Sequence, residues 1–426
     1  MTTLTAEPTK EALTTTATTT LTINDSFTLA CGQTLKNRLV KSAMSEQLGT
    51  SNHQPKLGLA KLYRRWAQGG IGLSMTGNIM IDRTALGEPK NVVLDEQSDL
   101  AEFKRWAAAG KQHGAHIWPQ LNHPGKQIPN FICDEPVAPS AISLGKQLSK
   151  GFNTPRALTE AEIIGIIKKF ATSARLSKAA GFTGVQIHGA HGYLVSQFLS
   201  SRHNQRDDQW GGSLANRMRF VLEVYRAMRK AVGDDFPIGI KLNSADFMKG
   251  GFTEEESMQV VKTLADAGID LIEISGGTYE SPTMMSGKVK QSTIEREAYF
   301  LDYMEKVRKL VKTPLVVTGG FRSAGAMNQA LQTGATDFIG IARTTAIDPD
   351  FPQKVLSNHA HSMPLTPPTT GNKGVDSAGM LGITWYEHQL WRIAKGKNPK
   401  PNLSAWGVII KTMLSAGIHG FKKRRA

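Results

Sequence analysis

Two histidines and a tyrosine lie within six residues in the stretch QIHGAHGYLVSQF, Gln186 to Phe198. His188 and His191 are three residues apart, and Tyr193 follows two residues later. Imidazoles at this spacing could hold a metal ion, donate hydrogen bonds to one oxygen atom, or simply occupy a solvated loop. Each interpretation requires a different set of neighbouring elements, so the fold must be inferred first.

One pattern occurs three times: the end of a helical segment, a glycine, and a short apolar run. It appears in residues 179–190, 265–277 and 332–342. Glycine can adopt the left-handed conformation that ends a helix, and continuous apolar runs are typical of parallel strands covered on both faces. Five further runs fit the same role: 37–44, 70–81, 115–122, 237–243 and 314–320.

Helical patterns alternate with these runs. Eight strands separated by helices predict an α/β fold, a (β/α)₈ TIM barrel in which all strands are parallel. Pro119 is unusual inside the third strand, because a closed barrel has no free edge for a residue without an N–H. We expect a bulge there, or the end of the strand. The helical patterns cover 57–68, 100–112, 159–180, 213–232, 253–267, 298–311 and 323–332.

The composition changes on both sides of the expected barrel, residues 23–357. Residues 1–22 are rich in threonine and poor in core-forming residues, which predicts a disordered segment and not a secretory signal. Residues 358–380 are rich in Pro, Thr, Gly and Ser and predict a linker. Residues 381–426 contain two helical patterns and nine basic residues against one acidic residue, which predicts a basic helical extension.

The charge of the chain is concentrated in this extension. It contributes 9 − 1 = +8 of the net charge of +15, so a nucleic-acid partner is not expected for the barrel. We expect the extension to pack on the barrel or on a second subunit of a homo-oligomer, with weak contact to an anionic membrane surface as the alternative. Only Cys31 and Cys133 are present, which excludes a disulfide framework and favours a cytoplasmic location.

The active site of such a barrel lies at the carboxyl ends of its strands. The residues expected there include almost no carboxylate, which argues against a metal site at His188 and His191. Besides these histidines and Tyr193, the strand ends supply Ala43, Met44, Ser45, Gly77, Gln120, Lys241, Gly319, Gly320, Ala342 and Arg343.

The ends of the seventh and eighth strands favour an anion. Gly319-Gly320 and Ala342-Arg343 offer backbone N–H groups and a cation where this type of barrel binds phosphate, although tight turns with a surface arginine would look the same. Gln120 could pair with an amide-like ring edge, and Lys241 could lie beside a ring atom that becomes negative. FMN has all three features.

The stretch QIHGAHGYLVSQFLSS and the following NQRDDQWGGSLANRMRF resemble the signature of the Old Yellow Enzyme family of flavin-dependent ene-reductases. The similarity also covers LKNRLVKSAMSE, WPQLNHPGKQ and DFIGIARTTAIDPDFP, and it extends over about residues 25–357. It implies a (β/α)₈ barrel that binds FMN, takes hydride from NADH or NADPH, and reduces the C=C bond of α,β-unsaturated carbonyl or nitro compounds.

The resemblance assigns roles to individual residues. His188 and His191 match the pair that binds the substrate carbonyl oxygen, and Tyr193 matches the proton donor. Gln120 matches the residue that binds the flavin pyrimidine edge, and Arg343 matches the phosphate-binding arginine. The residues expected to border the isoalloxazine ring are Ala43, Met44, Ser45 and Gly77.

Three positions depart from the family pattern. Lys241 stands where arginine is usual, Ser45 where threonine or cysteine is frequent, and Ala342 where a glycine precedes the phosphate arginine. A lysine is a point charge and not a planar fork, so the flavin potential is expected to differ.

Two other functions remain compatible with these residues. One keeps FMN and oxidises an amine or a dihydro-ring substrate, and the other is a non-enzymatic barrel that binds a phosphorylated ligand or an anionic surface. We expect the charges of 206–220 to fasten this loop to the next helix, with Ser213 as N-cap. Tyr279, Met284 and Met285 are candidates for residues that border or cap the site.

Overall fold

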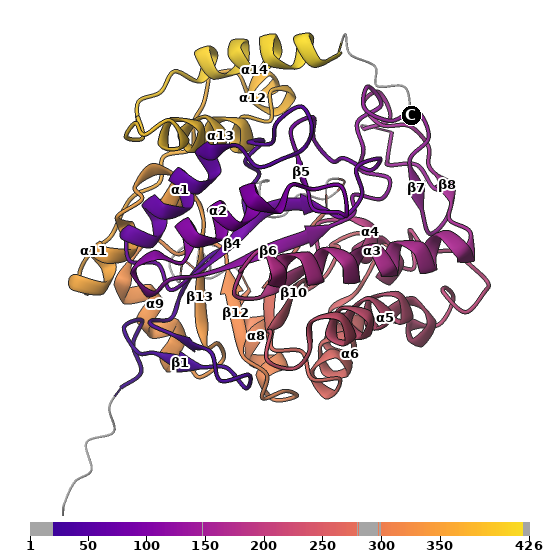
Figure 1. Cartoon of the computed structure of the whole chain (residues 1–426), viewed down its shortest axis with the longest axis horizontal. Helices are drawn as coiled ribbons and strands as arrows, with labels where there is room; N and C mark the ends of the chain where they lie inside the picture. Colours follow the sequence, from indigo (N-terminus) through magenta and orange to yellow (C-terminus); the bar gives the residue numbers. More distant parts are fainter. Residues whose placement is uncertain (1–19, 147, 279, 281–296, 298–299, 421–426) are drawn as a thin grey trace, which may run out of the picture.

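The computed structural model describes residues 20–146, 148–278, 280, 297 and 300–420. Eight parallel strands form a closed barrel, because the first of them, β3, pairs with the second, β4, and with the last, β13 (Figure 1). The predicted (β/α)₈ fold is therefore confirmed. The barrel strands are β3 (Leu39–Lys41), β4 (Leu73–Met80), β6 (His116–Asn122), β9 (Val185–Gly189), β10 (Ile238–Asn243), β11 (Leu271–Ser275), β12 (Leu315–Thr318) and β13 (Phe338–Ile341).

Helices cover the outside of the barrel, and their starts follow the expected capping rules. Thr159 and Thr253 each form a capping box with the glutamate three residues later, and Ser213 accepts a hydrogen bond from Asn216 N as N-cap. The helices between barrel strands are α1 (Leu57–Gln68), α2 (Leu100–Gly110), α3 (Glu160–Ala179), α5 (Leu214–Val232), α6 (Glu254–Asp266), α8 (Leu301–Arg308) and α9 (Ala324–Gln332).

The interior of the barrel has an apolar floor below a polar layer. Trp118, Phe338 and Met75 are fully buried in a cluster with Leu271 and Val316. Each large apolar side chain removed from water in this way contributes about 1.5–3 kcal/mol to stability. A hairpin of β1 (Phe27–Thr28) and β2 (Thr34–Leu35) belongs to this cluster through Phe27 and Leu35. The floor closes the amino-terminal end and leaves the opposite end for chemistry.

A β-bulge accommodates Pro119, which confirms one of the two alternatives expected for this residue. The register of β4 and β6 shifts there: Met75 pairs with Trp118 and Asn78 pairs with Gln120. Two residues of β4, Thr76 and Gly77, thus lie opposite the single Pro119. The bulge is in the partner strand, and it lets Thr76 Oγ1 accept a hydrogen bond from Gln120 N at 2.9 Å.

Further short elements complete the chain. The loops at the carboxyl ends of the barrel strands carry α4, the parallel pair β7–β8, and β5, which pairs in parallel with the end of β4. The last barrel strand is followed by α10 and α11. The bounds are β5 (Val92–Val93), β7 (Val137–Ala138), β8 (Arg156–Ala157), α4 (Leu194–Leu199), α10 (Arg343–Ile347) and α11 (Phe351–Ser357).

Three helices follow the barrel: α12 (Lys373–Ala378), α13 (Leu381–Ala394) and α14 (Ala405–Gly420). Helix α13 packs against α1 and α10, and α14 packs on α13 (Figure 1). The extension is thus helical and packs on the barrel of the same chain. No helix among residues 20–420, as far as they are described, is long and apolar enough to cross a membrane. Of the expected segment 1–22, residues 1–19 lie outside the described residues.

The close packing of the barrel interior predicts a large effect of one methyl group. A Cβ on Gly340 would lie 1.9 Å from Thr318 Oγ1 and 2.7 Å from Ser42 Oγ, two hydroxyls that already bond to each other. We expect Gly340→Ala to lower the free energy of unfolding by about 1–3 kcal/mol because of overpacking. Gly165→Ala in α3 is the control, since nothing lies within 4 Å of its Cβ, and it should stabilise by about 0.5–1 kcal/mol. Thermal denaturation of both variants measures the change in stability. Equal changes in the melting temperature of the two variants would contradict the packing described.

Candidate active site

The structure brings the three rings of the histidine-tyrosine stretch into contact. The ring centroids of His188 and His191 are 5.2 Å apart, and those of His188 and Tyr193 are 4.8 Å apart. Both pairs meet edge to face, at 82° and 72°. His188 lies at the carboxyl end of β9, His191 in the loop that follows, and Tyr193 at the start of α4. A single sequence segment therefore builds one compact polar cluster.

The backbone of His191 has a conformation that non-glycine residues rarely adopt. Its φ is +61°, in the left-handed region. Two hydrogen bonds hold it there: His191 N donates to Asn243 Oδ1 at 3.1 Å, and Gln127 Nε2 donates to His191 O at 3.1 Å. Strained backbone of this kind is concentrated at functional sites, where the surroundings maintain it. Here the strain aims the imidazole at Ser275 Oγ, 2.8 Å from Nε2.

Both imidazoles are held in the neutral form. Burial lowers the pKa of His188 well below the ordinary value, and the charges of His191 and Lys241 lower it further. Burial, together with the charge of Lys241, lowers the pKa of His191 to about 3. His188 Nδ1 accepts a hydrogen bond from Ala190 N at 3.3 Å, so the proton of the neutral ring is on Nε2. His188 is thus a neutral N–H donor.

A buried ion pair lies below the rings. Lys241 Nζ is 3.1 Å from Glu273 Oε1, and the two side chains are 4% and 0% exposed. Burial alone would raise the pKa of Glu273, but Lys241 and hydrogen bonds from Gln186 and Thr318 lower it overall. Glu273 is therefore a carboxylate that is paired with Lys241 in a buried part of the barrel.

This ion pair orients a row of amide groups. Glu273 Oε2 accepts a hydrogen bond from Gln186 Nε2 at 2.7 Å, which turns Gln186 Oε1 toward Gln120 Nε2, also at 2.7 Å. Gln120 must therefore present its Oε1 as the remaining acceptor. Among the described residues no donor bonds to that oxygen, so it is available to accept from a ligand N–H.

The loop after β3 is supported by a second buried cluster. Lys41 is fully buried, and its Nζ donates to Met75 O at 2.7 Å and to Tyr63 OH at 3.1 Å. The Tyr63 hydroxyl donates to the carboxylate of Glu46 and accepts from Gly77 N at 3.1 Å. Burial lowers the pKa of Lys41 to about 8. These contacts fix the β3 end against the β4 bulge.

The predicted ring-bordering residues lie at this rim. Ala43 and Met44 are partly buried against the core, and a Cβ on Gly77 would lie 2.6 Å from Met44 O. The N–H and carbonyl of Gly77 bond to Tyr63 and Thr76 side chains, so Gly77 provides close backbone packing and not a polar contact.

Ser45 is connected to the C-terminal extension. Its hydroxyl donates to Glu88 Oε1 at 2.6 Å. Burial and the charge of Glu387, in α13, raise the pKa of Glu88 to about 8. Glu387 also accepts hydrogen bonds from Gln47 Nε2 at 3.1 Å. The position of Glu387 near Ser45 could not be predicted from the sequence, because no local pattern relates residue 387 to the end of a strand.

The ends of β12 and β13 carry the residues that were predicted to hold a phosphate. Gly319 and Gly320 have φ values of +126° and +95°, conformations that glycine adopts freely. Ala342 precedes α10, and Arg343, its first residue, is exposed. The Arg343 guanidinium lies 5.5 Å from the centre of the Tyr386 ring of α13. Helix α13 thus contacts both ends of the site.

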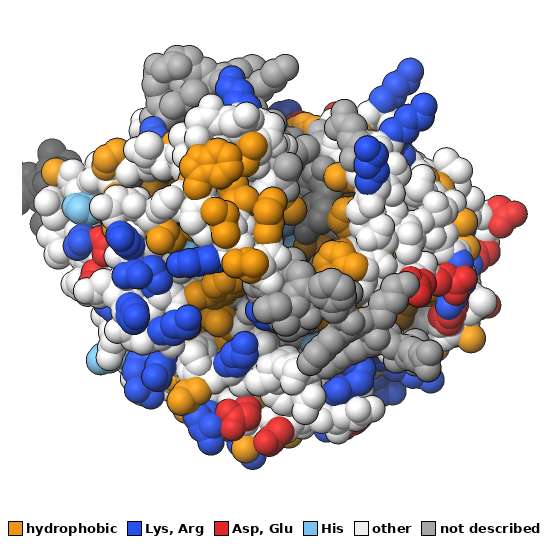
Figure 2. Space-filling model, turned by 90° about the horizontal axis from the view of Figure 1, so that it is seen from above, with side chains coloured by type: hydrophobic (Ala, Val, Ile, Leu, Met, Phe, Trp, Pro, Cys, Tyr) orange, Lys and Arg blue, Asp and Glu red, His pale blue; other side chains and the backbone are white. Residues whose placement is uncertain are grey.

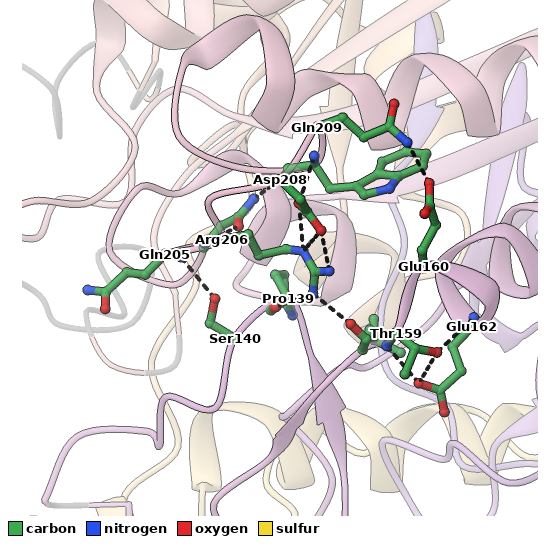
Figure 3. A network of polar contacts seen from close by, with 12 residues as sticks. Pro139, Ser140, Thr159, Glu160, Glu162, Gln205, Arg206, Asp208 and Gln209 are labelled. Atoms are coloured by element: carbon green, nitrogen blue, oxygen red, sulfur yellow. Dashed lines mark hydrogen bonds and ion pairs between the residues drawn. The ribbon is translucent and has the colours of Figure 1, made fainter.

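The charges of residues 206–220 were expected to fasten this loop to the next helix, and the structure also connects the loop to other elements. Arg206 bonds to Asp208 and donates to the carbonyls of Pro139 and Leu158, at 2.9 and 2.6 Å (Figure 3). Gln209 bonds to Glu160 at the start of α3. The conspicuous charges therefore connect the loop before α5 to the β7–β8 region.

The described residues contain no group of three or more His, Cys, Asp or Glu side chains that could hold a metal ion. Of the other candidates for the site border, Tyr279, Met284 and Met285 lie outside the described residues.

Comparison with known proteins identifies the family of this chain. The model of the NADH:flavin oxidoreductase / NADH oxidase family matches residues 27–362. The chain belongs to this family. The NADH-dependent flavin oxidoreductase iliE of Hypocrea jecorina is 39% identical over 355 residues, which cover 78% of this chain and 88% of that protein. The resemblance to the Old Yellow Enzyme family is thereby confirmed.

Solved structures of this family agree with the barrel. The Old Yellow Enzyme homologue from Zymomonas mobilis matches with a TM-score of 0.69 and 25% identity, over 82% of this chain and 95% of that chain. A 2-naphthoyl-CoA reductase matches with a TM-score of 0.71 and 28% identity over 79% of this chain. This chain spans 52% of the length of that reductase.

This member of the Old Yellow Enzyme family is therefore an oxidoreductase with FMN as its cofactor and a nicotinamide as its electron donor. The residues at the barrel mouth fit FMN. Thr344 Oγ1, beside Arg343, and the amide of Asn122, at the end of β6, are buried without a partner among the described residues. Buried polar groups are rarely left unpaired unless a ligand or water bonds to them.

The buried ion pair predicts a thermodynamic cycle. Lys241→Met or Glu273→Gln alone leaves one buried charge without its partner and should lower the free energy of unfolding by about 3–5 kcal/mol. The double variant should lose clearly less than the sum of the two single variants, because it leaves no unpaired charge. Urea unfolding of the FMN-free proteins measures this, and strictly additive losses would contradict the pairing.

The neutral imidazoles predict a flat pH dependence for ligand binding. An ordinary imidazole gains a proton as the pH falls through about 6.5 and becomes a stronger donor to a carbonyl. His191 protonates only near pH 3, so the affinity for a saturated ketone should not change between pH 5 and 8. Titration of the protein with the ketone, followed by the flavin absorbance, measures this affinity at each pH. An increase in affinity below pH 6.5 that disappears in His188→Gln/His191→Gln would show that the pair titrates.

Proposed function

We propose that this protein is an ene-reductase that reduces the C=C bond of α,β-unsaturated carbonyl or nitro compounds, with NADH or NADPH as the donor. The observation that carries this proposal is the contact of Tyr193 with His188, which in turn contacts His191; burial keeps both imidazoles neutral. Such a reduction requires donors for one substrate oxygen and a separate acid for one carbon, and this cluster contains both.

His188 and His191 are assigned to the substrate oxygen. Negative charge develops on that oxygen as the β-carbon is reduced, and fixed N–H donors stabilise it in the manner of an oxyanion hole. A neutral imidazole keeps one N–H and binds a neutral carbonyl without first releasing a proton. The hydrogen bonds of the His191 backbone hold this donor in place before the substrate arrives.

Tyr193 is assigned as the proton donor to the α-carbon. A phenol has an ordinary pKa of about 10, so it carries its proton at neutral pH and can transfer it as the oxygen charge collapses. The side chain is 7% exposed, which limits competition from water. Since the hydroxyl is regenerated from solvent, the residue is unchanged after each turnover.

Bound FMN supplies the hydride for the β-carbon. We assign Gln120 to its pyrimidine edge and Lys241 to the negative charge that the reduced ring carries, since both are held by the Glu273 network. The remaining assignments follow from position: the ring is bordered by Ala43, Met44, Ser45 and Gly77, and the phosphate is held by Gly319, Gly320, Ala342 and Arg343.

Tyr193→Phe tests this function. The variant should accept electrons from NADH at the normal rate and lose about 10²–10⁴-fold in flavin reoxidation by cyclohexenone, because only that half-reaction needs the acid. Anaerobic stopped-flow absorbance follows both half-reactions. Tyr225→Phe is the matched control, since Tyr225 is a buried tyrosine of α5 whose hydroxyl lies beside Gly268, before β11 begins and away from the site.

Two outcomes of the same experiment would count against the proposal. Equal losses in both half-reactions of Tyr193→Phe would remove the role of Tyr193 as a proton donor. Flavin that is reduced by an amine and never reoxidised by an enone would favour the oxidative alternative.

A further inference from the structure

Helix α14 exposes an apolar stripe to solvent. Four large hydrophobic side chains are 50–65% exposed: Trp406, Ile410, Met413 and Leu414. Their spacing places them on one face of the helix. The opposite face is buried against α13 through Ala405, Val408 and Ile409. Figure 2 shows hydrophobic side chains gathered on the face of the molecule that α14 forms in Figure 1.

Exposed lysines occur in α14 and in the segment just before it: Lys395, Lys397, Lys400 and Lys411. His388 of α13 bonds to Thr412, the neighbour of Lys411, at 3.3 Å. After burial, the charges of Lys411 and Lys395 both lower the pKa of His388, so both cations lie near this histidine. The sequence from residue 388 to residue 426 contains nine Lys and Arg residues and no Asp or Glu, and it ends in KKRRA.

An apolar stripe bordered by cations on a surface helix matches the interface of an anionic bilayer. The apolar side chains enter the boundary between headgroups and acyl chains, and lysines bind the negative headgroups. A second copy of this chain fits less well, because two such faces would bring uncompensated lysines together. We propose that α14, with the basic residues around it, docks this enzyme on anionic lipid surfaces.

Vesicle binding of the full-length, FMN-loaded enzyme tests this proposal. Phosphatidylcholine vesicles with about 30% phosphatidylserine should bind at least about 10-fold more tightly than pure phosphatidylcholine, and about 0.5 M salt should remove most of the difference. Co-sedimentation measures the bound fraction. Equal binding to both vesicle types, or none to either, would overturn the proposal.

Substitutions separate the apolar from the charged contribution. Ile410→Gln/Leu414→Gln should reduce binding to the anionic vesicles at least about 10-fold, and so should Lys395→Gln/Lys397→Gln/Lys411→Gln. Ile164→Gln is the matched control, because Ile164 is an exposed apolar residue of α3, 41% exposed, and should not matter. All variants should keep wild-type NADH oxidation. Unchanged vesicle binding in the Ile410/Leu414 variant would overturn the role of α14.

A direct readout locates the helix in the bilayer. Brominated acyl chains should quench part of the tryptophan fluorescence of the wild type, and this part should be absent in Trp406→Phe. Light scattering after gel filtration examines the competing occupant. A dimer that dissociates in Ile410→Gln/Leu414→Gln, without quenching in the wild type, would assign the stripe to a second copy instead.

Discussion

The ion pair of Lys241 and Glu273 is the constraint on which the site depends. Both side chains are almost fully buried, so each charged group must be satisfied by the other and by hydrogen bonds. Glu273 does this through Gln186 and Thr318, and Gln186 in turn orients Gln120. One buried charge pair therefore decides which polar atoms the barrel mouth offers. Burial is the main cause of the lowered pKa of both imidazoles, and the charge of the same lysine lowers each pKa further.

The site is organised before any substrate binds. The left-handed backbone of His191 is energetically unfavourable, and its hydrogen bonds with Asn243 and Gln127 offset this cost. The His188 ring packs against the rings of His191 and Tyr193. Catalysis by electrostatic stabilisation requires donors that do not reorganise during the reaction. Residues without any contact with the substrate, such as Asn243 and Gln127, therefore belong to the function of this site as positioning residues.

The sequence predicts the barrel well, because its information is local: short apolar runs alternate with helical patterns, and a glycine separates the two at three places. The eight strands and seven intervening helices lie where these patterns indicate. Pro119 shows the limit, since the bulge that accommodates it lies in β4, and strand pairing is not visible in either segment alone. The network of Gln186, Glu273 and Lys41 was missed for a related reason. A buried polar side chain in a strand fits neither the pattern of a core residue nor that of a surface residue. Its role becomes visible only when its neighbours in the fold are known.

The C-terminal extension changes what should be regarded as the minimal enzyme. Helix α13 places Glu387 beside Gln47, donates a hydrogen bond to Glu46 O from the Trp391 indole at 2.7 Å, and brings the Tyr386 ring against the Arg343 guanidinium. An engineered chain shortened to the end of α11 would retain all eight strands and yet lose these contacts with the ends of β3 and β13. Chimeras that exchange barrels between relatives should therefore transplant α13 together with the strands that it contacts.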